Sequence, residues 1–138
     1  MKEVKLTIKG YQTNLEGEEN NIEMITEGKF YKKNGVYYIV YDESELTGME
    51  GSTTTLKIEG KKVSLKRFGN NNSKLTFEKG QKHITEYETF YGNMPIEVVT
   101  SNVDVDISDL GRGRIKLAYR LDISGVLESK NKLSIEVN

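Results

Sequence analysis

The segment RIKLAYRLDIS, residues 114–124, has the pattern that decides the fold. Apolar side chains occupy every second position, and the positions between them carry charged or small side chains. Because successive side chains of a β-strand point to opposite faces of a sheet, this alternation predicts a strand with one buried face. The predicted inward set is Ile115, Leu117, Tyr119, Leu121 and Ile123.

The same two-residue period runs through most of the chain, for example in VKLTIKG (4–10) and LSIEV (133–137). Short turn signals separate these segments, and Asn34-Gly35 is the strongest because both residues tolerate positive φ. No helical period of useful length is present. We predict ten strands, at residues 2–13, 22–33, 36–43, 52–59, 62–68, 74–79, 82–91, 94–107, 113–124 and 132–138.

Ten strands joined by tight turns predict one all-β domain over residues 1–138, built as an up-and-down antiparallel meander. A long meander leaves unpaired backbone N–H and C=O groups on its two edge strands unless it closes. We therefore predict a single closed antiparallel barrel of about eight to ten strands. A sandwich is the alternative. The apolar phase changes after Val98, which predicts a β-bulge near Thr100–Asn102. The predicted core is Leu6, Ile8, Leu56, Ile58, Val63, Leu65, Ile115, Leu117, Leu121 and Ile135.

The segment HITEYETFYG, residues 83–92, has two candidate inward faces. One of them carries Glu86 and Glu88, and burying two unpaired carboxylates costs too much free energy. The other face carries hydroxyl groups, which tolerate burial when they find partners. We therefore predict a partly polar interior, with Thr85, Tyr87, Thr89 and Tyr91 facing inward.

Composition bounds the function. The chain has 138 residues, a net charge of −1 and no Cys, which excludes a disulfide scaffold and thiolate chemistry. The near-neutral charge argues against a nucleic-acid partner. No apolar run approaches the length of a membrane span, and the N-terminus lacks the apolar core of a signal peptide. We therefore expect a cytoplasmic protein with no membrane partner.

The motifs in the sequence do not indicate catalysis. DVDISDLG (104–111) fails as a calcium loop, because Asp109 and Ile115 stand where Gly and Glu are needed. His83 is the only His. Ser129 and Lys132 have the spacing of a catalytic pair, but that chemistry needs a helix and this segment reads as a turn. We predict no catalytic residue, no metal site and no cofactor, and hence a protein that is not an enzyme.

Five segments spread along the chain carry a family resemblance. They are VYYIVYDESELTG (36–48), TTTLKIEGKKVSLKRFG (53–69), YETFYG (87–92), IEVVTSNV (96–103) and IKLAYRLDISG (115–125). Together they resemble the YwiB-like family of small bacterial proteins. The resemblance implies a calycin-like barrel, the broad group that includes lipocalins and fatty-acid-binding proteins. The family's function is not established, so the resemblance implies no site residues. The chain has no Trp, so the Gly-x-Trp signature of lipocalins is absent.

Two charged residues share the inward phase of their strands. Arg67 follows Val63 and Leu65, and Glu43 follows Tyr41. Strand direction alternates in a meander, which places the longer predicted loops of this chain at one end, and loops on a rigid scaffold are where binding residues collect. We predict a polar cavity there that binds a small molecule, below an acidic rim of Glu16, Glu18, Glu19, Glu45 and Glu50. The candidate ligand-binding residues are Tyr41, Glu43, Arg67, Tyr87, Thr89, Tyr91 and Tyr119.

The pairing of these charges leaves two alternatives open. Arg67 pairs with Glu43 or with an anionic group of a ligand, since Arg recognises carboxylates well. Alternatively, the pair only closes the barrel end, and a filled barrel works through its surface with a protein partner. The sequence does not identify the ligand, the pathway or the oligomeric state.

Overall fold

The computed structural model describes residues 1–47, 49–70, 72–89 and 92–138. It contains ten strands in one antiparallel sheet, with a short 3-10 helix, η1 (Glu45–Thr47), after the third. The strands are β1 (Lys2–Asn14), β2 (Glu19–Lys33), β3 (Val36–Asp42), β4 (Ser52–Glu59), β5 (Lys62–Gly69), β6 (Ser73–Phe77), β7 (Lys82–Thr89), β8 (Gly92–Ile107), β9 (Gly113–Ile123) and β10 (Leu127–Val137).

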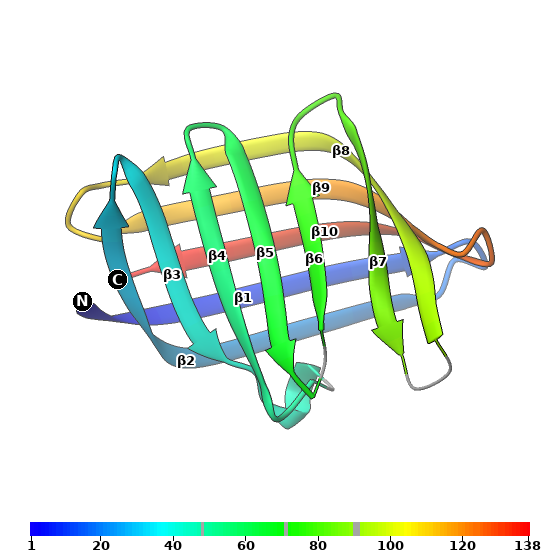
Figure 1. Cartoon of the computed structure of the whole chain (residues 1–138), viewed down its shortest axis with the longest axis horizontal. Coiled ribbons are helices and arrows are strands. Elements are labelled where there is room, and N and C mark those ends of the chain that lie inside the picture. The colour runs from blue at the N-terminus through cyan, green and yellow to red at the C-terminus, as the bar shows by residue number, and fades with distance from the viewer. Residues whose placement is uncertain (48, 71, 90–91) are drawn as a thin grey trace.

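The sheet is an up-and-down barrel. Strands that follow one another in the chain pair, except β6 and β7, and β1 also pairs with β10, so the sheet order runs from β6 back to β1 and then from β10 back to β7. Lys5 and Asn138 exchange two backbone hydrogen bonds, of 2.8 and 2.9 Å, where the two ends of the chain meet. In Figure 1, strands β3 to β6 cross in front of β8, β9, β10 and β1, which form the opposite wall. The predicted antiparallel up-and-down barrel is confirmed.

The barrel is nearly closed, with a seam between β6 and β7. In the described part of the chain, one isolated bridge spans this seam, between Asn72, which directly precedes β6, and Glu88 on β7. Next to the seam, Phe77 on β6 packs against Tyr119 on β9 with ring centroids 4.6 Å apart. The predicted bulge is also present, since the register between β8 and β9 shifts between Thr100 and Asn102.

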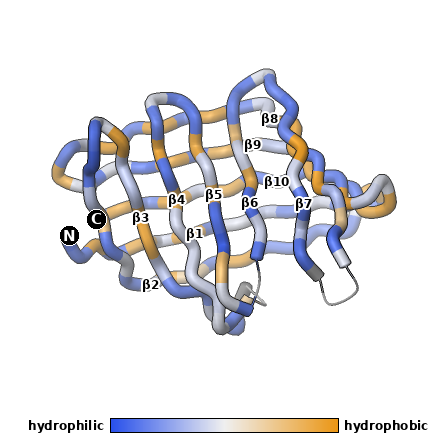
Figure 2. The backbone as a smooth tube through the Cα atoms, in the orientation of Figure 1, coloured by the Kyte–Doolittle hydropathy of each residue, from blue (hydrophilic) through white to orange (hydrophobic). Residues whose placement is uncertain are grey.

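Hydrophobic and hydrophilic residues alternate along β8, β9 and β10 in Figure 2, and buried hydrophobic residues form the core. Nine of the ten predicted core residues are buried, and Leu121 is the exception because it is only partly covered. The inward phase of β7 is also as predicted: Tyr87 packs against the core, whereas Ile84 on the other face is 67% exposed.

Two strands begin three or more residues earlier than the sequence predicts. We expected strands from residues 22 and 132, but β2 starts at Glu19 and β10 at Leu127. The added segments place Asn20, Ser129 and Asn131 toward the barrel interior, and these residues are polar. Apolar alternation therefore stops where the inward residues of these two strands become polar.

The two ends of the barrel differ in their connections. The loops after β1, β3, β5, β7 and β9 lie at one end, at the lower right of Figure 1, and we call it the open end. The other end, which we call the closed end, is covered by the β8–β9 loop. There Asp109 accepts hydrogen bonds from Tyr37 and from Lys32, and a Cβ added at Gly111 would lie 2.8 Å from the Phe30 ring.

None of the described residues forms a helix long and apolar enough to cross a membrane.

Candidate functional site

A cavity of about 330 Å³ lies inside the barrel at its open end. Its apolar lining comes from both walls and includes Ile8, Met24, Leu65, Leu75 and Leu133. A second hollow of about 300 Å³ adjoins it, shares Gln12, Asn20 and Leu121 with it, and extends toward the β1–β2 and β9–β10 turns. Together they form a space of the size that small-molecule sites usually have.

Strand register brings the polar lining together as two rows. On one wall Tyr41 lies opposite Thr54, and Thr54 lies opposite Arg67. On the other wall, directly opposed positions run across four strands, in the order Asn20, Gln12, Asn131 and Tyr119. Tyr41, Arg67 and this second row all line the same cavity.

Glu43 is the most deeply buried charge of the site. It follows β3 directly, and its backbone N–H donates to Ser52 O at 2.9 Å, which holds the residue at the start of the loop. Its side chain is 1% exposed. Oε1 accepts a 2.5 Å hydrogen bond from Thr54 Oγ1 and one of 3.3 Å from Arg67 Nε. Oε2 is buried and has no hydrogen-bond partner among the described residues.

Arg67 keeps most of its donors for the cavity. Its side chain is 17% exposed, and the bond to Glu43 uses Nε. In the part of the chain that the structure describes, this is the one hydrogen bond of the guanidinium group, so the two terminal nitrogens have N–H donors to offer. The ion pair is therefore only half used: the terminal nitrogens of Arg67 and Oε2 of Glu43 form no hydrogen bond with the described residues.

Two tyrosines flank this pair, and both stay protonated over a wide pH range. Burial, and then the negative charge of Glu43, raise the pKa of Tyr41 above its ordinary value of 10.0, against the opposing effect of Arg67. Burial also raises the pKa of Tyr119, and the charge of Arg67 partly offsets this rise. Both side chains therefore present neutral hydroxyl groups at pH 7.

The amide row was missed by sequence reasoning. Gln12 and Asn20 are exposed at the open end, and the Asn131 amide donates to Ser129 Oγ at 3.0 Å. Strand phase was a usable signal, because Gln12 shares the phase of Leu6 and Ile8, and Asn131 shares that of Ile135. The sequence instead predicts Gln12 at the end of a strand and Asn20 and Asn131 in connections between strands.

The structure brings together four of the seven predicted site residues. Tyr41, Glu43, Arg67 and Tyr119 line the cavity. Tyr87 packs against the core from β7 and is not among the lining residues. The side chain of Thr89 and all of Tyr91 lie outside the described residues. Although Glu43 follows the end of β3, its side chain is buried and does not reach water.

The rim of the cavity is acidic and partly apolar. The five predicted rim carboxylates, Glu16, Glu18, Glu19, Glu45 and Glu50, are all exposed. Leu15, Leu46, Val126 and Leu127 are also exposed on loops or strand ends at this end of the barrel. A molecule that enters here therefore passes negative charge and apolar side chains before it reaches Arg67.

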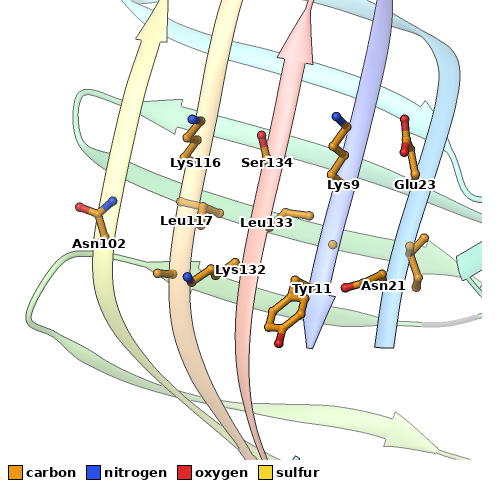
Figure 3. A pocket seen from close by; sticks show the side chains of 13 residues that line it. Lys9, Tyr11, Asn21, Glu23, Asn102, Lys116, Leu117, Lys132, Leu133 and Ser134 are labelled. Carbon is orange, nitrogen blue, oxygen red and sulfur yellow. The ribbon is translucent and has the colours of Figure 1, made fainter. Parts of the chain in front are cut away.

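A separate groove of about 580 Å³ lies on the outer wall, over β8, β9, β10, β1 and β2. Figure 3 shows Lys116, Ser134, Lys9 and Glu23 side by side on four adjacent strands, with Tyr11 beyond them. Lys9, Lys116 and Lys132 are exposed and form no ion pair within the described ranges. The groove is therefore a basic surface on the outer side of the wall, and it shares Gly10, Tyr11, Ile22, Lys132 and Leu133 with the lining of the interior cavity.

His83 and the segment 104–111, for which the sequence predicts no catalytic or metal-binding role, lie on the surface beside charged side chains. His83 lies 3.1 Å from Glu78 Oε1 on the surface, and Asp104 lies 3.9 Å from Arg114 on the outer face. Among the described residues, no three His, Asp or Glu side chains are grouped so that they could hold a metal ion.

Comparison with known proteins places this barrel in a family. Residues 6–135 match the family described as Domain of unknown function (DUF1934). The chain belongs to the DUF1934 family. Its fold is similar to that in the crystal structure of YwiB protein from Bacillus subtilis, with a TM-score of 0.81, 23% sequence identity, and coverage of 99% of this chain and 92% of that one. The predicted resemblance to the YwiB-like family is confirmed. A comparison with curated proteins finds no match.

Proposed function

We propose that this DUF1934 protein is a non-enzymatic binding protein that holds a small molecule in the cavity at the open end. The observation that carries the proposal is the half-used ion pair. Glu43 Oε2 is buried without a hydrogen-bond partner among the described residues, and Arg67, whose terminal nitrogens form no hydrogen bond there, lines the same cavity. An unsatisfied buried oxygen costs free energy, so a ligand that supplies a donor there gains affinity.

The rest of the cavity supports the same proposal. Ligand sites are mostly apolar with a few well-placed polar groups that fix orientation. Here the apolar side chains of Ile8, Met24 and Leu65 surround one ion pair and one row of amides. We propose binding in preference to catalysis because these groups are suited to hold and orient a molecule. The cytoplasm stays the predicted location.

Native mass spectrometry of the protein purified from its own host tests this function. The matched variant is Gly10→Leu, because Gly10 lines the cavity and a Cβ added there meets nothing within 4 Å. We expect extra mass on the wild-type protein and none on Gly10→Leu. Thr7→Leu adds the same side chain to the outer face of β1 and should keep the extra mass. Bare wild-type protein, or equal loading of all three proteins, would contradict the proposal.

The outer groove supports a second candidate function, as an interaction protein. Three lysines without ion pairs among the described residues surround a floor of small residues, Gly10, Ala118 and Ser134. We propose that the occupant would be an acidic segment of a protein partner, since unpaired surface lysines attract negative charge at low salt.

A fluorescein-labelled hexaglutamate peptide tests this second function by fluorescence anisotropy. Lys9→Glu, Lys116→Glu and Lys132→Glu combined should abolish binding. The control combines Lys61→Glu, Lys62→Glu and Lys66→Glu, which makes the same change in net charge on exposed residues away from the groove. Equal loss of binding in both triple variants would show attraction to the overall charge and would exclude a groove site.

A further inference from the structure

We propose that the cavity selects a neutral head group in which a hydrogen-bond donor lies beside an acceptor, such as an amide or a lactam, attached to a short apolar tail. This inference rests on the proposed binding function and deepens it. It replaces the anionic ligand group considered above as the partner of Arg67.

The donor of the head group is required by Glu43. An ionised carboxylate only accepts hydrogen bonds. Oε1 already accepts from Thr54 and Arg67, whereas Oε2 has no partner among the described residues and is shielded from solvent. A ligand N–H or O–H placed there satisfies an oxygen that this part of the chain leaves unpaired. A second carboxylate in the same place would instead bring two acceptors together.

The acceptor of the head group is required by Arg67. Its Nε donates to Glu43, and its terminal nitrogens form no hydrogen bond with the described residues, so their N–H groups are left to bind a ligand. The guanidinium group is a planar fork of donors and accepts nothing. A carbonyl oxygen next to the ligand's donor therefore completes the pair, and the planar edge of an amide offers both atoms at once.

Charge balance decides between a neutral and an anionic head group. Glu43 and Arg67 carry opposite charges that cancel, and both lie largely out of solvent. An anionic ligand would leave one net negative charge in the cavity, where charges are expensive to bury. The exposed rim carboxylates add repulsion along the entry path. A neutral ligand avoids both costs.

The remaining lining fixes the size and polarity of the tail. About 330 Å³ is available, and Ile8, Met24, Leu65 and Leu75 provide an apolar wall near the ion pair. Gln12 and Asn20 lie toward the mouth, where the two hollows meet. The cavity thus suits a polar head with a short aliphatic or aromatic body.

Binding of hexanamide and of hexanoate, followed by NMR chemical shifts of the ¹⁵N-labelled protein at pH 7, tests the inference. The probes share a tail, and hexanoate is ionised at this pH. We expect the wild-type protein to bind hexanamide roughly tenfold more tightly or better, the effect of one hydrogen bond to a charged group. Glu43→Gln leaves the charge of Arg67 unbalanced and should reverse the preference to hexanoate. Glu45→Gln makes the same change on the exposed rim and should keep the preference for hexanamide, because the buried ion pair is intact.

Each outcome of this experiment is decisive. Tighter binding of hexanoate by the wild-type protein, or equal affinities that Glu43→Gln does not change, would overturn the head-group inference and leave the cavity as a binding site. If neither probe shifts the signals of cavity residues in any variant, the proposed function fails, and the inference fails with it. Should Glu43→Gln not fold, the ratio of the two wild-type affinities decides alone.

Discussion

The two ends of the barrel interior are built from the same strands but hold different contents. The closed end is solid, with Leu6, Ile39, Phe77 and Val137 each 0% exposed. At the open end the inward positions carry an ion pair, two tyrosines and a row of amides around a cavity. The change occurs within single strands: on β1 the inward residues Val4, Leu6 and Ile8 are followed by Gly10 and Gln12.

This difference shows how a small barrel supports both stability and a site. Buried apolar area is the main source of folding free energy, so the closed end stabilises the barrel. The open end is then able to keep unsatisfied polar atoms, which destabilise a fold but orient a ligand.

The largest expected effect is at the closed end. Leu6→Ala should lower the free energy of unfolding by about 2–5 kcal/mol, because Leu6 is fully buried and the remaining cavity adds to the lost transfer free energy. Urea unfolding measures the change. Ile25→Ala on β2 is the control, since Ile25 is 62% exposed and its loss should cost less than about 0.5 kcal/mol. Equal losses would mean that the closed end is not the solid core.

Gly28→Ala tests whether the closed end has any spare room. A Cβ at Gly28 would lie 2.8 Å from Leu6 Cδ1 and 2.9 Å from Val40 O, so the backbone or the core must shift. We expect a loss of about 1–3 kcal/mol, the usual cost of overpacking. Thermal or urea unfolding measures it, and an unchanged stability would show that this end is loosely packed.

Arg67→Met tests how much the ion pair at the open end contributes to stability. It leaves Glu43 buried without its counter-charge, and we expect a loss of about 1–2 kcal/mol because Arg67 keeps some contact with solvent. Glu43→Gln combined with Arg67→Met should recover part of this loss. Urea unfolding of both single variants and the double variant gives the coupling. Losses that add within about 0.3–0.5 kcal/mol would show that the pair does not interact.

The buried tyrosines predict an alkaline loss of stability. Burial raises the pKa of Tyr41 above its ordinary value of 10.0 in the folded protein. Below pH 10 the hydroxyl is protonated in both states. Above it the unfolded chain ionises first, so stability falls by at most about 1.4 kcal/mol per pH unit for one group. Tyr41→Phe should therefore lose about 1 kcal/mol less than the wild-type protein between pH 10 and pH 11. Parallel curves would indicate an accessible Tyr41 hydroxyl.

The sequence predicts the residues of the closed end well and those of the open end only in part. Apolar alternation located the ten strands, nine of ten core residues and the bulge at Thr100. Strand phase also predicted that Arg67 and Glu43 face inward. The starts of β2 and β10 and the amides Gln12, Asn20 and Asn131 were missed, because polar inward residues look the same as a turn when apolar alternation is the signal.

The contact between Glu43 and Arg67 also goes beyond what strand phase provides. Strand phase predicts only which face of the sheet a side chain is on. The 3.3 Å contact between Arg67 Nε and Glu43 Oε1 also depends on the register, which places Thr54 on β4 between β3 and β5, and on where the chain leaves β3. The cavity volume depends on how both walls pack, which no single strand specifies.

The stability of Gly10→Ala tests the central claim most directly, because Gly10 lies on β1 and faces the open end as Gly28 on β2 faces the closed end. A Cβ at Gly10 meets nothing within 4 Å. We predict an unfolding free energy equal to that of the wild-type protein or higher by up to about 1 kcal/mol, since Ala restricts the unfolded chain. A loss of about 1–3 kcal/mol, as expected for Gly28→Ala, would show that the open end is as tightly packed as the closed end and would contradict the account.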